Sequence, residues 1–474
     1  MPNVFRNLPS VGELLESPPL KSLIDRVNRN VVIGRVKQFL DDMQRQVRAA
    51  AAGMHVPAPA ELALRIADWI NTDRLPAIIP VINATGNILH PQLGGAPLPD
   101  EAIAELAALT RGYASFNMNL ATGGDSAAVA AIERQLQRLT GAGAATITCS
   151  LASAAMVSLA AMAANREIIV ARGEITAIDG NSRLPDLFQT SGAKLRETGT
   201  ANVTRIDDYA AAITQQTAAI LHLTASGFAV IGIAARPPLE ELVSLARRSK
   251  LPLIHCLAQT SLLDLSPYGI TDGSEVAKSV QCGADLMIFP GDGFIGGPPC
   301  GILVGRRSLI EAIEKHPLMP PVRAEKLTLA ALGATLRLYE DQDVAERAIP
   351  VLSLLATPLE NLRQRAERLA PQIAATGLTT VEIVAAKSYI AGHEVPGQSL
   401  PTVVLALSAK EGPAEQLAEA LRTGAPSIVV TIDNDRLILD LRSVLPRDDL
   451  SLISAFTSLS RPTESQPTAP AVEL

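Results

Sequence analysis

Cysteines, long apolar runs and an excess of positive charge are all lacking in this chain of 474 residues. Four cysteines in so long a chain do not make a disulfide framework, which favours a reducing, cytoplasmic location. No segment offers about 18 uncharged apolar residues in a row, so we predict no membrane span. The first residues, Met1 to Arg6, contain no apolar segment, and we therefore expect no secretory signal.

The charge balance limits the range of partners. The net charge is −7, whereas a nucleic-acid-binding protein is more often basic or gathers its basic residues on one face. We therefore expect no DNA partner. The net charge leaves open whether a local basic patch binds RNA. The composition is 47% hydrophobic, which is ample for a large core and, with the length, indicates two or three domains.

The N-terminal part, residues 1–75, is predicted to be helical. Its apolar residues recur at helical spacing with polar residues between them: Val31, Val32, Val36, Phe39, Leu40, Met43 and Val47. The same stretch is the most basic of the N-terminal part, through Arg26, Arg29, Arg35, Lys37, Arg45 and Arg48. One interpretation is a solvated helix face, and the other is a contact with an RNA backbone.

Residues 76–340 show a different pattern, in which short β-branched runs alternate with helical ones. The predicted strands are Ala145–Cys149, Ile168–Val170, Ala218–Leu223, Pro252–Cys256, Asp285–Phe289 and Gly301–Val304. Such alternation is typical of an α/β domain with a mostly parallel sheet covered by helices on both faces. Because ligands bind at the carboxyl ends of the strands in such sheets, we look for chemistry in the loops there.

Residues 341–458 are predicted to form a smaller α+β domain, and residues 459–474 a disordered tail rich in proline and polar residues. A helix is predicted from Pro358 to Leu369, with Thr357 as its N-cap and Pro358 at its first position. The predicted strands of this domain are Val381–Val384, Thr402–Leu405 and Leu437–Leu441.

Several motifs in order along the chain carry a resemblance to a known family. The opening segment is Val81 to His90, and the most specific motifs are Gly291-Asp292, Gly296-Gly297-Pro298 and the run from Arg323 to Leu332. Further matches are Arg172-Gly173-Glu174, Glu197 to Asn202, Leu262 to Gly269 and Leu437 to Arg442. Together, over about residues 8–450, they resemble bacterial selenocysteine synthase, the L-seryl-tRNA(Sec) selenium transferase family.

The resemblance implies the aspartate-aminotransferase fold, which is fold type I of the enzymes that use pyridoxal phosphate. It also implies a homo-oligomer, either a dimer or a ring of dimers, with sites built at subunit contacts. In the family a lysine follows the Gly-Asp pair and holds the cofactor as a Schiff base, and an aspartate faces the pyridinium nitrogen. Gly293 stands in place of that lysine and Cys256 in place of that aspartate. We therefore expect no intact catalytic residue and no covalently bound cofactor.

Other polar positions of the family are also replaced. Thr224 and Gly227 stand where the family has His and Asn, and Gly95 and Thr431 each stand where it has Arg. A basic family motif aligns with residues 124–128, which carry Asp125 and no cation. Of the crevice, the resemblance leaves the following candidates for cofactor-binding positions: Ser150, Ser153, Thr224, Cys256, Asp292 and Arg323. Ser150 and Ser153 fit either an anion site or a plain N-cap at a helix start.

The remaining reactive side chains give no separate site. Cys149, Cys256, Cys282 and Cys300 are interpreted as small buried hydrophobic residues rather than as a thiol or metal site with His222 or His255, because no metal-ligand spacing is present. We predict no metal. Lys278, Lys194 and Lys326 are the lysines nearest to the site-forming segments, and none stands at the required position.

We weigh three functions. The first is a selenocysteine-synthase-like protein that has lost catalysis with pyridoxal phosphate and binds or assembles, with a tRNA or a protein as partner. The second is an active pyridoxal-phosphate-dependent selenium transferase that converts seryl-tRNA(Sec) to selenocysteinyl-tRNA(Sec) with another lysine. The third is a structural subunit that partners an active paralogue.

Overall fold

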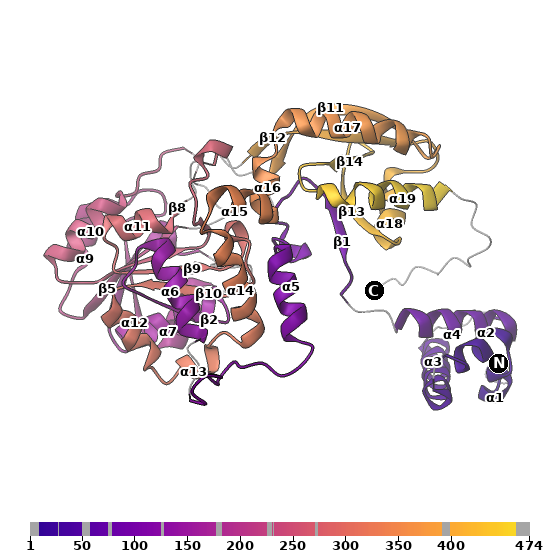
Figure 1. Ribbon diagram of the computed structural model, residues 1–474, viewed down its shortest axis with the longest axis horizontal. Coiled ribbons are helices and arrows are strands. Elements are labelled where there is room, and N and C mark those ends of the chain that lie inside the picture. The colour runs from indigo at the N-terminus through magenta and orange to yellow at the C-terminus, as the bar shows by residue number, and fades with distance from the viewer. Residues whose placement is uncertain are drawn as a thin grey trace. The chain divides into compact units, whose positions relative to one another are not determined.

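The computed structural model describes residues 9–26, 28–49, 57–73, 78–124, 128–176, 183–224, 230, 232–270, 274–390 and 399–460. It divides into two compact units, Met1–Pro80 and Val81–Leu474, and each is described here by itself (Figure 1). The finer domain boundaries at residues 75, 340 and 458 remain predictions. The predicted tail falls mostly outside the described residues, which end at residue 460. In the described ranges, no helix has the length and apolar character needed to cross a bilayer.

The first unit is helical, as predicted. Its helices are α1 (Val11–Leu15), α2 (Pro18–Ile24), α3 (Arg29–Ala49) and α4 (Pro59–Asp73). They bury a small aliphatic core in which Val32 and Val36 of α3 meet Leu62 and Ile66 of α4. Val31, which the spacing placed in this core, is instead 49% exposed, because its neighbour Val32 already occupies the inward position of that turn.

One exposed edge of α3 packs on the tryptophan of the chain. The rings of Phe39 and Trp69 meet edge to face with their centroids 5.6 Å apart. The guanidinium of Arg35 lies 5.7 Å from the centre of the Trp69 ring, within the range of a cation–π contact. Arg35 of the basic stretch therefore has an intramolecular role, and the predicted RNA contact of this stretch stays a prediction.

The second unit contains a seven-stranded sheet that matches the predicted class. Its order is β2-β10-β9-β6-β5-β3-β4, and only β10 runs antiparallel to its neighbours. The strands are β2 (Ala144–Thr148), β3 (Glu167–Ala171), β4 (Lys194–Thr198), β5 (Thr217–Thr224), β6 (Leu253–Leu257), β9 (Leu286–Pro290) and β10 (Gly301–Gly305). The predicted strands of this region are confirmed to within a residue or two. The sequence reading missed β4, an edge strand whose residues are mostly polar and exposed.

Helices cover both faces of this sheet. Along β3 the side chains alternate, with Ile169 in one buried cluster and Ile168 in another. In Figure 1, α9 (Ile206–Ala212), α10 (Leu239–Arg248) and α11 (Val276–Cys282) lie above the sheet, and α7 (Leu151–Ala163) and α12 (Arg307–Glu314) lie below it. Both core clusters are therefore closed by amphipathic helices, as the alternating pattern requires.

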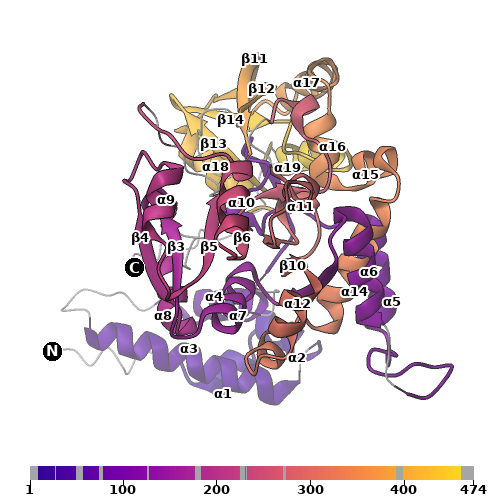
Figure 2. The same ribbon diagram turned by 90° about the vertical axis from the view of Figure 1, so that its left-hand side faces the viewer.

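Further elements complete this region. The helices are α5 (Asp100–Leu109), α6 (Ala128–Thr140), α8 (Leu184–Ser191), α13 (Met319–Val322), α14 (Lys326–Leu338), α15 (Gln342–Ala348) and α16 (Pro350–Ala356). Two short strands, β7 (Thr260–Ser261) and β8 (Ser274–Glu275), pair in parallel. Figure 2 shows α5, α6 and α14 grouped together at one side of the sheet.

A five-stranded sheet in the order β1-β13-β14-β12-β11 forms the other layer of this unit. Its strands are β1 (Val81–Ala84), β11 (Thr379–Tyr389), β12 (Ser399–Ala409), β13 (Ser427–Asp433) and β14 (Arg436–Asp440). Three helices, α17 (Leu359–Ala374), α18 (Ala414–Thr423) and α19 (Asp449–Ser460), pack on it around Leu362, Leu421 and Phe456. β1 comes from the range predicted for the large domain, yet it pairs with β13 of this sheet.

The start of α17 differs from the prediction by one residue. Pro358 is the N-cap and Leu359 the first helical residue, whereas Thr357 was predicted as the cap. The Thr357 hydroxyl instead donates a hydrogen bond to the carbonyl oxygen of Ser353 in α16, with an oxygen–oxygen distance of 2.7 Å. The preceding helix thus uses the hydroxyl that would otherwise cap α17.

A buried carboxylate fixes the segment that follows β1. Asp440 accepts hydrogen bonds from the hydroxyls of Ser388 (2.6 Å) and Thr402 (2.7 Å) and from the Arg442 amide (2.9 Å). Burial nevertheless raises its pKa above the usual range. Gly86 has φ +78°, and a Cβ there would lie 2.5 Å from the Asp440 Oδ2. The chain can therefore pass this carboxylate only with glycine at position 86.

This contact gives a test of the fold. We expect Gly86→Ala to lower the free energy of unfolding by about 2 kcal/mol or more, because the left-handed backbone and the clash with Asp440 both oppose the new side chain. Gly94→Ala is the matched control, since Gly94 has φ +85° and no neighbour near its added Cβ. Urea unfolding of both variants separates the cost of the clash from the cost of the left-handed backbone. An equal loss of unfolding free energy in the two variants would contradict the role given to Asp440.

Candidate functional site

A crevice of about 400 Å³ opens at the carboxyl ends of the large-sheet strands, where the loops were expected to carry chemistry. Its walls come from the loop after β1, the start of α7, the loop after β6 and the loop between β9 and β10. The lining residues are Leu89, Pro91, Gly94, Gly95, Ser150, Leu151, Ala258, Gln259, Thr260, Pro290, Asp292, Gly293, Phe294, Pro299 and Cys300.

Gly293 lies in the wall of this crevice with open space in front of it. It has φ +65°, and the nearest atom to an added Cβ would be the Leu89 Cδ1, 4.0 Å away. Its neighbours in the loop are far more tightly packed, since a Cβ on Gly297 would come within 2.7 Å of the Gly291 carbonyl oxygen. The loop therefore has room for a side chain at position 293, although a residue other than glycine would be strained by the positive φ.

Two ionisable groups near Gly293 have perturbed pKa values. Burial raises the pKa of the Asp292 carboxyl above its usual range. Burial, with the nearby Asp292 charge as a smaller cause, also raises the pKa of the Cys300 thiol. Both effects favour neutral groups, so Cys300 stays a thiol at neutral pH and contributes no nucleophile to this wall.

Ser150 lies where the crevice meets the start of α7. It is the N-cap of that helix, and its hydroxyl accepts from the Ser153 amide (3.1 Å) while the Ser153 hydroxyl accepts from the Ser150 amide (3.0 Å). The N-cap interpretation is therefore confirmed. The remaining first-turn amides of α7 and the positive end of its dipole still make this a favourable place for an anion.

The predicted site residues are only partly gathered. Ser150, Asp292 and Gly293 line the crevice, and so does Gly95. Ser153 does not line it but contacts the hydroxyl of Ser150. Thr431 instead lines a hollow on the five-stranded sheet. Gly227 and Asp125 lie outside the described residues.

Cys256 is packed in the hydrophobic core below the sheet and is 1% exposed. Burial raises the pKa of its thiol to about 12, so the group is neutral near pH 7. A neutral thiol offers no negative charge to a pyridinium nitrogen.

Arg323 is exposed at the end of α13. Its positive charge opposes the rise of the Glu133 pKa, which burial and the charge of Glu314 bring to about 7. Arg323 thus interacts electrostatically with Glu133 of α6, and it is not among the residues that line the crevice.

Behind the crevice, the ends of β5 and β6 carry a paired set of polar groups that the sequence reading did not recognise as a unit. His222 Nδ1 lies 2.9 Å from the buried Glu174 carboxylate, and the His222 and His255 rings stack with centroids 4.9 Å apart. His255 Nε2 contacts the Thr224 hydroxyl at 3.0 Å. The pKa of His255 is well below its usual range, first because of burial and then because of His222. Glu174 could have been found from its place in the Arg172-Gly173-Glu174 motif.

The histidines and cysteines do not converge on a metal site. His255 bonds to Thr224 and Ser279, while Cys256 points to the other face of the sheet, as expected for adjacent residues of one strand. Over the described ranges, no cluster of three or more His, Cys, Asp or Glu side chains is arranged to hold a metal.

The three lysines nearest to the site-forming segments in the sequence lie away from the crevice. Lys194 begins β4, at the amino end of the strand and so at the opposite edge of the sheet from the crevice. Lys278 is exposed and pairs with Glu275 at 2.6 Å. Lys326 begins α14 and lines a different pocket. None of the three is among the residues that line the crevice.

Comparison with known proteins identifies the group to which this architecture belongs. The family model described as L-seryl-tRNA selenium transferase matches residues 81–445, and that described as selenocysteine synthase N terminal matches residues 5–43. The chain belongs to the L-seryl-tRNA selenium transferase family. The L-seryl-tRNA(Sec) selenium transferase of Hyphomonas neptunium is 36% identical over 97% of this chain and 100% of the relative. That of Moorella thermoacetica is 35% identical over 96% of each chain.

A solved structure supports the fold alone. D-glucosaminate-6-phosphate ammonia-lyase superposes with a TM-score of 0.57 and 18% identity, covering 81% of this chain and 96% of that one. The expected fold class is therefore confirmed, and the family resemblance is confirmed by the sequence matches.

Family membership corrects one expectation. We expected no cofactor, and this is wrong, because members of the selenium transferase family are expected to use pyridoxal phosphate. The crevice fits part of that group: its volume and the first turn of α7 suit the phosphate and ring. It does not fit the rest, since the lining residues include no lysine and Cys256 is a buried neutral thiol. No catalytic step through the cofactor follows from these residues.

The cysteines differ from their prediction at Cys149 and at Cys282, which is only partly buried, and this difference gives a test. Cys256 and Cys300 are buried as expected, but Cys149 is exposed, where it contacts the Ser153 hydroxyl at 3.5 Å. We expect Cys149 to react first with a disulfide reagent, Cys282 more slowly, and Cys256 and Cys300 only on unfolding, because thiolates react and burial keeps the last two protonated. Thiol counting in buffer and in denaturant, with Cys149→Ser as control, checks this order. Early labelling of Cys256 would contradict its placement in the core.

Proposed function

We propose that this selenium transferase family member binds an anion of the pyridoxal phosphate type in its crevice without a Schiff base at position 293, and serves as a binding or assembly protein. The observation that carries the proposal is Gly293. It occupies the crevice wall with open space before it and no amine. A homo-oligomeric state, a cytoplasmic location and a tRNA or protein partner form part of the proposal.

The polar groups around the crevice support this reading. Asp292 and Cys300 have pKa values raised by burial, and Thr224 and His255 bond to each other. The crevice therefore offers a helix start for an anion, and its lining residues include no lysine. Binding of an anion needs only the helix start, whereas transfer chemistry also needs an amine and a partner that holds a proton.

A second candidate is an active selenium transferase, the activity for which the relatives are named. This would require an amine that the crevice-lining residues do not supply. The third candidate, a subunit that assembles with an active paralogue, would be favoured if a lysine-bearing relative co-purified with this chain.

Borohydride reduction distinguishes these candidates. The purified protein is mixed with pyridoxal phosphate, reduced and digested, and modified lysines are mapped by mass spectrometry. We expect saturable binding, seen as a thermal shift, without a stoichiometric lysine adduct. Gly293→Leu should abolish the shift by filling the crevice, and Gly293→Ala is the control that carries the same backbone strain without the bulk. A single stoichiometric adduct would support the active transferase, and the absence of any shift would overturn the binding site.

Restoring the lysine tests whether the loss is confined to one position. We expect Gly293→Lys to fold with a cost of about 1–2 kcal/mol from its positive φ. It should give no turnover of seryl-tRNA(Sec) with selenophosphate, because Cys256 still offers no carboxylate. The Moorella thermoacetica relative serves as positive control in the same assay. Turnover by the single variant would show that the surrounding crevice is intact and would refute the proposed loss of catalysis.

A further inference from the structure

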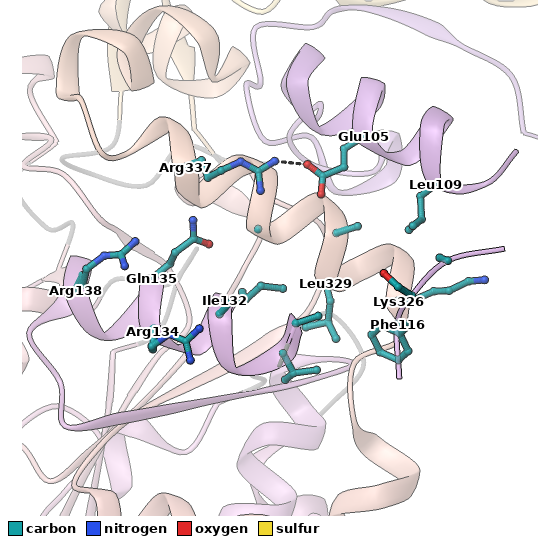
Figure 3. Close-up of a pocket in the computed structure, with 17 residues that line it drawn as sticks. Glu105, Leu109, Phe116, Ile132, Arg134, Gln135, Arg138, Lys326, Leu329 and Arg337 are labelled. Carbon is teal, nitrogen blue, oxygen red and sulfur yellow. Dashed lines mark hydrogen bonds and ion pairs between the residues drawn. The ribbon is translucent and has the colours of Figure 1, made fainter. Parts of the chain in front are cut away.

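A second pocket, of about 490 Å³, lies between α5, α6 and α14 and shares no lining residue with the crevice (Figure 3). Its volume is within the range of small-molecule sites. Neither the proposed function nor the family match accounts for it.

The base of this pocket is apolar. Ile132 of α6 and Leu329 of α14 lie at its centre in Figure 3, and Phe116 closes one end. Gly333 lets the two helices approach, since a Cβ there would lie 3.3 Å from the Ile132 side chain. Glycine inside a helix costs about 1 kcal/mol relative to alanine, so this close approach of α6 and α14 is kept at some expense to α14.

The rim is cationic although the whole chain is acidic. Arg134 and Arg138 lie one turn apart on α6, and Arg337 projects from α14 on the other side (Figure 3). Arg138 pairs with Glu340 at 3.2 Å and Arg337 with Glu105, but all four side chains are more than one-third exposed. Exposed pairs of this kind are worth about 1 kcal/mol or less, so a ligand anion can compete for these guanidinium groups.

Arg134 differs from the other two arginines. In the described part of the chain, no carboxylate lies within ion-pair distance of its guanidinium, although its charge acts on the pKa of its neighbour Glu133. A guanidinium fork presents paired N–H donors that match a carboxylate. Arg134 is therefore the group best placed to receive one.

We propose that this pocket binds a medium-chain fatty carboxylate, with the alkyl chain over Ile132 and Leu329 and the carboxylate on Arg134. The apolar base accounts for the chain and the arginine rim for the charge. Phe116 is the one aromatic side chain among the lining residues, so the pocket suits a flexible alkyl chain better than stacked nucleobases.

Calorimetric titration of the full chain with decanoate tests the proposal. We expect saturable binding of one decanoate per chain, and weaker binding of decanol, which has the same chain without the charge. Arg134→Gln should weaken decanoate binding about tenfold or more and leave decanol binding unchanged. Arg363→Gln is the matched control, because Arg363 is an exposed arginine of α17 whose ion pair with Glu360 is 3.9 Å long.

A second variant tests the apolar base. Gly333→Leu should abolish the binding of both ligands by filling the pocket, while Arg134→Gln remains informative if the leucine variant does not fold. Binding that is unsaturable, or that Arg134→Gln and Arg363→Gln weaken equally, would overturn the site. The site would also be overturned if a second copy of the chain covers this face. In that case decanoate would bind only after dilution has halved the molar mass of the protein.

Discussion

The close packing of the loop between β9 and β10 is the constraint on which the crevice depends. Gly291 packs against Cys300, Gly297 against the carbonyl of Gly291, and Gly301 against that of Ser150. These contacts tie the loop to the last strand and to the start of α7, and each leaves no room for a Cβ. Position 293 is the exception, since the loop there faces open space. The tightly packed glycines hold the shape of this loop, while position 293 leaves open space in the crevice wall.

The strands of the large sheet could be predicted because each is a run of buried β-branched and aliphatic residues. β4 could not, since its residues Lys194 to Thr198 are largely exposed at an edge and carry no apolar pattern. β1 was read as part of the large domain because sequence order suggested it, whereas its partner Ser427 is far along the chain. The cap of α17 was misplaced by one residue because the sequence does not show that Thr357 bonds backwards to Ser353.

The candidate site could be located from motifs but not assembled from them. The Gly-Asp pair and the α7 start were found from the sequence, and the structure brings both to one crevice. The position of Cys256 in the core and of Arg323 beside Glu133 depends on which way each side chain turns, and this is decided by packing rather than by local sequence. The pairing of Glu174 with His222 joins residues 48 positions apart, so no spacing rule would have shown it.

The position of β1 in the five-stranded sheet has a consequence for biosynthesis. Val81 emerges from the ribosome long before Ser427, its partner in the parallel ladder, and the whole large sheet is made between them. The edge of the smaller sheet can therefore close only after Ser427 has been made, and until then the backbone groups of β1 lack the strand with which they pair. Contacts of such sequence separation slow folding and expose strand edges meanwhile. The synthesis of β13 thus controls when the segment leading into the crevice, through Gly86 and Leu89, becomes fixed.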